Sequence, residues 1–342
     1  MKALVIGGGS IGSRHLLNLK SLGVDSLAVI EPDARRLLTL SQSENLLAFD
    51  MLERALEWNP DLVVIASPTH FHAEQALATA RYGCPLFIEK PLSHSLEGLD
   101  ILCAEVDRRN LVTMVGCNMR FHPGPAMVKR LIGEGAIGKI IAARIQTGSY
   151  LPRWRPSQDY RNSYSASSKW GGVILDCIHE IDLALWYFGP ASVVAAARLP
   201  ATTIGLEIDG LAEIILNHKS SVLSNLHLNF VQRDYRRACQ VIGSEGTIYW
   251  DFGHRQVEVF GPDGELRESF LEPRGWQVNQ MYVDELDHFL RAVQSGRPTC
   301  NPVSQGLVAL QLAITAKTMP SRGVHENSGH HTGTHGVHAS SR

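Results

Sequence analysis

Residues 171–182 read GGVILDCIHEID and place four acidic or imidazole groups within one short apolar run. Asp176, His179 and Asp182 are spaced three residues apart, so in a single helix they would share one face. Histidine suits proton transfer because its unperturbed pKa of about 6.5 lies near working pH. Three interpretations are open: a proton-transfer site in which Asp176 supports His179, a metal site, or a helix capped by Asp176 with His179 in the core.

Two further polar clusters each follow an apolar run that is typical of a buried strand. The sequence ASPTHFH at 66–72 follows one run, and IEKP at 88–91 follows the other. Ligands of open parallel sheets bind in the crevice beyond the carboxyl ends of the strands. Lys90 is therefore a site candidate from topology alone.

The element that would position these groups begins at the first residues, MKALVIGGGSIG. ALVI predicts a buried strand, and Gly7, Gly9 and Gly12 have the GxGxxG spacing ahead of a helical pattern. Gly7 would make the tight turn, Gly9 would admit a pyrophosphate, and Gly12 would let the helix pack closely on the strand. The order of strand, glycine turn and helix predicts dinucleotide binding at a helix N-terminus.

The next strand, SLAVIE, ends in Glu31, about 20 residues beyond the glycines. An acidic side chain here accepts hydrogen bonds from an adenosine ribose diol, so the sequence favours NAD as cofactor. NADP stays open, because Arg35 and Arg36 are near enough in sequence to meet a 2′-phosphate.

Strands and amphipathic helices continue to alternate as far as residue 118. Continuous apolar strands between amphipathic helices predict a parallel sheet covered on both faces. We therefore expect a Rossmann domain, a doubly wound parallel sheet, over residues 1–118.

In order along the chain, GGGSIG, EKP at 89–91, GCNMRFHP at 116–123 and GGVILDCIHEID resemble motifs of one family. It is the glucose–fructose oxidoreductase, inositol dehydrogenase and rhizopine-catabolism (Gfo/Idh/MocA) family of NAD(P)-dependent oxidoreductases. The resemblance implies a second α/β domain with a large, mostly antiparallel sheet that presents the substrate. Strand-like runs from residue 139 and two closing helical patterns, at 282–296 and 304–319, fit this expectation.

We assign residues 119–323 to this substrate-binding and oligomerisation domain. The remaining 324–342 form a His-rich tail that we expect to be disordered, since it lacks apolar periodicity. The cofactor contacts predicted from the motif, the strand ends and the resemblance are Gly7, Gly9, Ser10, Ile11, Gly12, Glu31, Ser67, Pro68, Thr69, His72, Glu89 and Lys90.

The resemblance implies that Lys90, Asp176 and His179 are catalytic. We assign general acid/base catalysis to His179, with Lys90 as the alternative, and expect the Lys90 ammonium to hydrogen-bond the reacting oxygen. Many relatives have three residues between the Asp and the His, whereas only Cys177 and Ile178 intervene here, so His179 is the firmer assignment. We expect no metal, because no third ligand at suitable spacing accompanies Asp176 and His179.

The segment between the first long strand and the double glycine, GSYLPRWRPSQDYRNSYSASSKW, is rich in Arg and aromatic residues. Aromatic rings stack on sugars, and Arg binds carboxylate or phosphate, so an acidic sugar or a nucleotide sugar fits this composition. The alternative is an arm that contacts a neighbouring subunit. The substrate contacts predicted here and at the domain junction are Asn118, Arg120, His122, Arg153, Arg155, Arg161 and Tyr164.

With 342 residues, 44% hydrophobic content and a net charge of −2, the chain has no basic excess for nucleic acid or anionic membranes. Six cysteines without CxxC spacing, no signal peptide and no run of about 18 apolar residues predict a cytoplasmic protein that spans no membrane. We expect a homo-oligomer, a dimer or tetramer.

These features favour an enzyme that transfers a hydride between nicotinamide and a secondary alcohol or ketone of a sugar, cyclitol or nucleotide sugar. Two alternatives stay open from the sequence. One is a non-catalytic NAD(P)-binding regulator with the same fold, and the other is an NAD-dependent glycosidase.

Overall fold

Six parallel strands near the N-terminus form a sheet with the order β3-β2-β1-β4-β5-β6. The computed structural model describes residues 1–44, 46–154, 156 and 159–320. The elements of this part are β1 (Lys2–Ile6), α1 (Ser10–Ser21), β2 (Ser26–Ile30), α2 (Ala34–Glu44), β3 (Leu47–Phe49), α3 (Leu52–Glu57), β4 (Leu62–Ile65), η1 (Thr69–Phe71), α4 (His72–Tyr82), β5 (Leu86–Glu89), α5 (Leu99–Arg109), β6 (Thr113–Gly116), η2 (Asn118–Phe121) and α6 (Pro123–Gly133).

The strand order reverses between β1 and β4, and the chain there leaves the sheet through Gly7 and Ser67 respectively. Every residue of β4 and β5 is buried, as expected for strands with helices on both faces. The reversal point is where doubly wound sheets bind their ligands. The predicted Rossmann fold is confirmed.

The second sheet has eight strands in the order β14-β13-β12-β11-β7-β10-β9-β8. Among its strand pairs only β7–β10 is parallel in the described part of the chain. The prediction of a large, mostly antiparallel sheet is thereby confirmed. Its elements are β7 (Ile140–Tyr150), η3 (Leu151–Arg153), η4 (Tyr160–Asn162), η5 (Tyr164–Ala166), α7 (Val173–Asp176), α8 (Ile178–Phe188), β8 (Ala191–Pro200), η6 (Thr202–Ile204), β9 (Asp209–His218), β10 (Leu223–Asn229), β11 (Val231–Gly243), β12 (Gly246–Asp251), β13 (Gln256–Phe260) and β14 (Leu266–Leu271).

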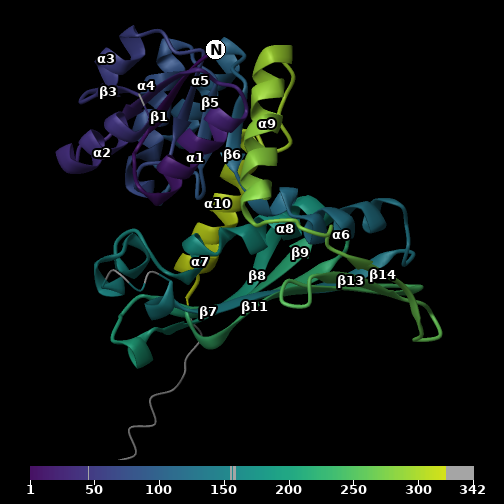
Figure 1. Cartoon of the computed structure of the whole chain (residues 1–342). Helices are drawn as coiled ribbons and strands as arrows, with labels where there is room; N and C mark the ends of the chain where they lie inside the picture. Colours follow the sequence, from purple (N-terminus) through teal and green to yellow (C-terminus); the bar gives the residue numbers. More distant parts are fainter. Residues whose placement is uncertain (45, 155, 157–158, 321–342) are drawn as a thin grey trace, which may run out of the picture.

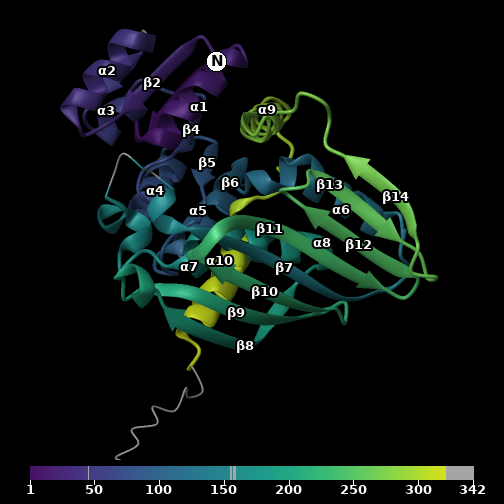
Figure 2. The same ribbon diagram turned by 60° about the horizontal axis from the view of Figure 1, so that its bottom comes forward.

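One face of this sheet is covered by α6, α7, α8 and α10 (Val303–Thr318), and these helices lie between the sheet and the N-terminal unit (Figures 1 and 2). Burial alternates along the strands accordingly, as in β9, where Ala212, Ile214 and Leu216 are buried and face the helices. The sequence did not predict β14, because its residues Leu266–Leu271 are mostly exposed and lack an apolar alternation.

The C-terminal helices return to the first sheet. Helix α9 (Asn279–Ser295) packs against α1, as Figure 1 shows, and buries Leu286, Phe289 and Leu290 in a cluster with residues of β1 and α1. After α9, Asn301 forms two hydrogen bonds with Val115 of the edge strand β6, at 2.8 and 2.9 Å. The exposed edge of the parallel sheet is thus covered by the chain itself.

The described part of the chain contains no helix that is long and apolar enough to cross a membrane. All six cysteines are unpaired. The predicted tail at 324–342 lies outside the described residues.

We expect the substitution Phe289→Ala to lower the free energy of unfolding by about 3–5 kcal/mol, because it opens a cavity between α9 and the first sheet. Leu271→Ala is the control, since Leu271 is 73% exposed and should change stability by less than about 0.5 kcal/mol. Denaturant titration measures both. Equal stability of the two variants would contradict the docking of α9 on the first sheet.

Candidate active site

The glycine turn after β1 is tightly packed at Gly7 and Gly12 and open at Gly9. Gly7 has φ +98°, and a Cβ on it would lie 2.8 Å from the Ala66 carbonyl oxygen. A Cβ on Gly12 would lie 1.8 Å from the Gly7 oxygen, so helix α1 must approach the turn with a glycine. A Cβ on Gly9 would meet nothing within 4 Å. The open space beside Gly9, at the N-terminus of α1, fits a pyrophosphate.

Ser10 and Ile11, also predicted as cofactor contacts, form the first turn of α1 and lie next to this open space. Gly9 is the N-cap residue and no side chain caps the helix. The free backbone N–H groups at this end are the ones an anion can accept.

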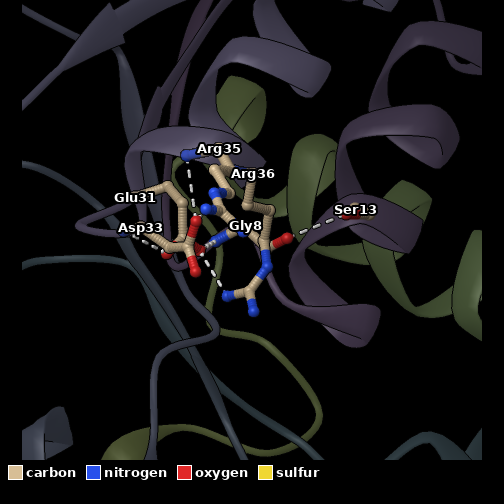
Figure 3. A network of polar contacts seen from close by, with 6 residues as sticks. All are labelled: Gly8, Ser13, Glu31, Asp33, Arg35 and Arg36. Carbon is tan, nitrogen blue, oxygen red and sulfur yellow. Dashed lines mark hydrogen bonds and ion pairs between the residues drawn. The ribbon is translucent and has the colours of Figure 1, made fainter. Parts of the chain in front are cut away.

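Glu31, at the end of β2, contacts the glycine turn (Figure 3). Its carboxylate is 4% exposed and accepts a hydrogen bond from the Gly8 backbone N at 2.8 Å. The other oxygen accepts from the Asp33 backbone N at 2.9 Å, and the Arg36 guanidinium donates to the first oxygen at 3.1 Å. These hydrogen bonds hold Glu31 beside the glycine turn, and the Arg36 guanidinium is paired with the Glu31 carboxylate.

The loop after β4 carries four predicted cofactor contacts. Ser67 donates to Gln75 at 2.6 Å, Pro68 is exposed, and Thr69 is buried at the start of η1. His72 is 1% exposed, and its ring nitrogens lie 2.8 Å from the Ser67 oxygen and 3.0 Å from the Pro91 oxygen. Because its two ring nitrogens face carbonyl oxygens of Pro91 and Ser67, His72 connects the loops that follow β4 and β5 and neither nitrogen points to a ligand.

Lys90 follows β5 and reaches the other sheet's helices. Its Nζ donates to the Asp176 backbone oxygen at 3.0 Å and lies 3.6 Å from Asp176 Oδ1. Burial would lower the pKa of Lys90, but the carboxylates of Asp176 and Glu89 outweigh it and raise the pKa above its usual value. Lys90 is thus protonated at neutral pH and 22% exposed on its side chain.

Asp176 receives a second donor from the substrate-side loop. The Tyr164 hydroxyl donates a short hydrogen bond to Oδ1, whereas Oδ2 is buried without a hydrogen-bond partner in the described part of the chain. Burial and the neighbouring Asp176 charge raise the pKa of Tyr164 well above its usual value. Tyr164, predicted to bind substrate, therefore holds the Asp176 carboxylate.

The segment 171–182 is two helices, and the expectation of a single helix is wrong. Helix α7 ends at Asp176, Cys177 has φ −93° and ψ 32°, and α8 starts at Ile178. The break separates the three predicted partners, because Asp176 turns to Lys90 whereas Asp182 turns to Arg120.

His179 lies in the first turn of α8 and is 8% exposed. Burial lowers its pKa well below the usual value, and the positive charges of Lys90 and Arg237 lower it further. Its Nδ1 has no hydrogen-bond partner among the described residues. A neutral imidazole with a free nitrogen can accept a proton at neutral pH.

Arg237 was not predicted from the sequence. It lies on β11 and donates to Glu180 at 2.6 Å, and Glu180, in the first turn of α8, is fully buried. The sequence of β11 does not distinguish Arg237 from Arg233 and Arg236. Only the packing of α8 on the sheet brings Arg237 to a buried carboxylate.

Two of the three predicted substrate residues at the domain junction, Arg120 and His122, have other partners. Arg120 forms a bidentate pair with Asp182, at 2.7 and 2.8 Å, and both side chains are at most 4% exposed. His122 caps α6 through the Gly124 N–H at 3.1 Å and lies among Trp250, Phe252 and Trp276. Burial, with lesser contributions from Arg237 and Arg255, lowers the pKa of His122 to about 3.

The prediction that Arg120 and His122 bind substrate is therefore not supported by their contacts, since each brings together structural elements instead. Asn118 is 5% exposed, and its Oδ1 has no hydrogen-bond partner among the described residues. It stays a predicted substrate contact.

The loop arginines are at the surface. Arg153 lies 5.7 Å from the centroid of the Tyr150 ring, and Arg161 lies over Tyr160 and 3.8 Å from Asp159. The structure does not place either beside Lys90, and Arg155 lies outside the described residues. Within the described ranges there is no group of three or more His, Cys, Asp or Glu residues that could hold a metal ion.

Residues 1–117 match the family model described as "Oxidoreductase family, NAD-binding Rossmann fold", and residues 126–249 match the "GFO/IDH/MocA C-terminal domain". The chain is 30% identical over 332 residues to myo-inositol 2-dehydrogenase of Thermotoga maritima, covering 93% of this chain and 95% of that protein. It is 27% identical to inositol 2-dehydrogenase of Rhizobium meliloti, over 91% of this chain and 94% of that one. The chain belongs to the Gfo/Idh/MocA family.

Solved structures show the same fold. Levoglucosan dehydrogenase in complex with NADH and levoglucosan superposes with a TM-score of 0.81 at 20% identity, over 92% of this chain and 96% of that one. UDP-N-acetylglucosamine 3-dehydrogenase from Acidithiobacillus ferrooxidans gives a TM-score of 0.78 at 21% identity, over 94% of this chain and 98% of that one. The Gfo/Idh/MocA resemblance of the sequence motifs is confirmed, with an NAD-binding Rossmann domain at the N-terminus.

We expect Glu31→Ser to shift cofactor preference from NAD towards NADP, because it frees Arg36 to meet a 2′-phosphate. The ratio of the Kd for NADP to the Kd for NAD should fall at least about tenfold, which corresponds to about 1.4 kcal/mol. Titration of protein fluorescence measures both constants without a substrate. The double variant Glu31→Ser/Arg36→Ala is the control and should lose the gain for NADP, and an unchanged ratio in Glu31→Ser would contradict the role of Glu31.

We expect Arg120→Ala to lower the free energy of unfolding by about 3–5 kcal/mol, because it leaves Asp182 buried without its partner. The double variant Arg120→Met/Asp182→Leu should recover most of this loss, since it removes both charges. Thermal and denaturant unfolding measure the effect. A variant Arg120→Ala that keeps full stability and only weakens substrate binding would restore the substrate-contact interpretation.

Proposed function

We propose that this protein is an NAD-dependent oxidoreductase that transfers a hydride between nicotinamide and a secondary alcohol or ketone of a sugar, cyclitol or nucleotide sugar. The observation that carries the proposal is the meeting of Lys90, from the first sheet, with Asp176 and the neighbouring His179, from the helices of the second. The residues have the charge states that oxidation of an alcohol requires: a protonated ammonium and a neutral imidazole.

The residues present fit NAD. The open space beside Gly9 and the uncapped N-terminus of α1 would hold the pyrophosphate, and Glu31 would accept from the adenosine ribose. When bound, the cofactor supplies the nicotinamide ring that accepts or donates the hydride. The loops after β4 and β5 lie at the same edge of the sheet, so Lys90 stands at the side where the ring belongs.

Each catalytic candidate has a distinct task. The Lys90 ammonium hydrogen-bonds the reacting oxygen and stabilises negative charge on it. His179 accepts the hydroxyl proton, because its lowered pKa keeps it neutral at neutral pH. Asp176, held by Tyr164, fixes the ammonium from the opposite side.

The substrate class follows from the relatives. The curated relatives include inositol 2-dehydrogenases and a levoglucosan dehydrogenase, whose names specify cyclic polyols or sugars. Asn118, Arg153, Arg155 and Arg161 stay predicted substrate contacts, and the arginines favour a substrate that carries a carboxylate or phosphate. A screen of cyclitols, sugars, uronic acids and nucleotide sugars for NADH fluorescence tests the proposal.

The regulator alternative makes the opposite prediction in this screen. A regulator of the same fold would bind NAD and give no NADH with any compound, whereas an NAD-dependent glycosidase would release a leaving group without net NADH. The presence of Lys90 at 3.6 Å from Asp176, and near enough to His179 to lower its pKa, favours the dehydrogenase.

We also propose that the enzyme works in the cytoplasm as a homo-oligomer with a cofactor unit at 1–118 and a substrate unit at 119–323. The matches to the two family models lie on either side of this boundary. The large sheet supports an interface through the face that no helix of the described residues covers, where Val194, Leu199, Leu223 and Tyr249 are 40–56% exposed. The unpaired cysteines suit a reducing compartment.

We expect Lys90→Met and His179→Leu each to lower kcat by about 10²–10⁴-fold. Lys90→Met removes the ammonium that stabilises negative charge on the reacting oxygen, and His179→Leu removes the base that accepts the hydroxyl proton. The Kd for NAD should stay within about threefold of wild type in both. For the wild type, kcat/KM for alcohol oxidation should hold through the pH range in which an ordinary histidine becomes protonated and fall only at lower pH, because burial depresses the pKa of His179 and the imidazole stays neutral above it. Stopped-flow and steady-state kinetics measure these values. Wild-type turnover in either variant would contradict the catalytic role proposed for the residue it replaces.

A further inference from the structure

His15 is a buried polar residue of the cofactor-binding helix that neither the motif nor the catalytic group explains. It lies three residues after Gly12 on α1 and is completely buried. Its ring packs edge-on against Phe87 and Tyr282, with centroids 5.2 and 6.4 Å away. Within the described chain its Nδ1 has no hydrogen-bond partner, and its Nε2 donates to Glu89 Oε1 at 2.6 Å.

Glu89 joins this histidine to the catalytic lysine. It is the last residue of β5 and its side chain is 10% exposed. One oxygen binds His15, and the other accepts from the backbone N of Lys90 at 3.2 Å. The carboxylate is thus fixed at both oxygens, directly beside the residue that reaches Asp176.

A hydrogen-bonded polar pair in this apolar surrounding is a poor means of stabilising the fold. Burying a carboxylate and an imidazole costs desolvation free energy that packed hydrophobic residues would not incur. The pair instead connects two parts of the site: α1, whose N-terminus faces the cofactor phosphates, and the strand end that carries Lys90.

We propose that His15 and Glu89 form a positioning pair that fixes Lys90 at the reacting oxygen, with the Glu89 carboxylate supplying negative charge beside its ammonium. This inference rests on the proposed function, since it assigns a task within the same site. His15 acts through Glu89 and touches no reacting atom.

The charges around the lysine support an electrostatic part for Glu89. Glu89 is second after Asp176 among the groups that raise the pKa of Lys90 against the effect of burial. The groups that face Lys90 are Asp176 and Cys177 at the end of α7, His179 on α8, Tyr282 on α9, Cys117 after β6 and Glu89 itself. The titratable groups that face Glu89, besides Lys90, are His15, His72, Tyr282 and Glu285.

Glu285 provides an internal control for this charge effect. It lies on α9, is completely buried, and has no hydrogen-bond partner on either oxygen within the described chain. Burial, followed by the neighbouring Glu89 and Asp182, raises the pKa of Glu285 well above its usual value, which favours its uncharged form. We therefore expect that removing its acidity takes little charge from the surroundings of Lys90.

The test measures the pKa of Lys90 directly, from the pH dependence of its acetylation by acetic anhydride, read by peptide mass spectrometry on the full chain. We expect Glu89→Gln to lower the pKa of Lys90 by about one to two units, because one negative charge is lost nearby. Glu285→Gln should leave it unchanged. This readout needs no substrate, so it can succeed or fail independently of the dehydrogenase activity.

The positioning part is tested by kinetics. His15→Leu should lower kcat by about 10- to 100-fold with the KM for NAD within about threefold, and His15→Gln, which keeps a donor, should recover most of the loss. His218→Leu is the control: His218 is a buried histidine on β9 that contacts Gly189 and Ser224, and its loss should lower Tm without changing kcat.

If His15→Leu fails to fold, Glu89→Gln and His15→Gln supply the comparison. A Lys90 pKa that is the same in Glu89→Gln as in wild type would overturn the electrostatic role. A kcat that falls in His15→Leu and His218→Leu alike, in proportion to Tm, would reduce the pair to a structural one. No NADH from any substrate alongside a shifted Lys90 pKa would overturn the proposed function and leave the inference about charge standing.

Discussion

The contact between Lys90 and Asp176 is the interaction on which the arrangement of the site depends, because its two members come from different sheets. Lys90 follows a strand of the parallel sheet, and Asp176 ends a short helix on the antiparallel one. That helix begins directly after Gly172, which has φ +101°. Any other residue there would place its Cβ 2.7 Å from the Asp209 carboxylate oxygens, so the turn needs a glycine. Lys317 of α10 donates to the Gly171 oxygen at 2.6 Å and holds the same turn. The double glycine therefore positions the Asp176 carboxylate that faces Lys90.

The same environment shifts two neighbouring groups in opposite directions. Both are buried, which disfavours the charged form of each, yet Lys90 faces carboxylates whereas His179 faces Lys90 and Arg237. The lysine consequently stays charged and the histidine neutral. An acid and a base that coexist at neutral pH within one site are what transfer of a proton and a hydride from one alcohol carbon requires. Arg237, which pairs with Glu180 of α8, also lowers the pKa of His179, although Arg237 is distant from it in sequence.

The sequence predicted those features that depend on local spacing. The glycine turn, Glu31 at the end of its strand and the lysine after β5 follow from motif and periodicity, and each lies where the parallel sheet puts it. It could not predict the break at Cys177, because residues 173–182 contain no Gly or Pro that would mark an interruption. Nor could it show that Arg120 forms an ion pair with Asp182, or that His15 forms a hydrogen bond with Glu89, 74 residues away. Such pairs between residues distant in sequence depend on how the elements pack in the folded protein. His15 had one signal, its place three residues beyond the glycine motif.

A crystal structure of the enzyme with NAD and a substrate identified by the screen tests the central claim most directly, through two distances. We predict that the hydroxyl oxygen on the reacting carbon lies within about 3.2 Å of both Lys90 Nζ and a ring nitrogen of His179. Glu89 should still bind His15 in that complex. A reacting oxygen more than about 4 Å from both groups, in a complex that turns over in the crystal, would contradict the assignment of the site.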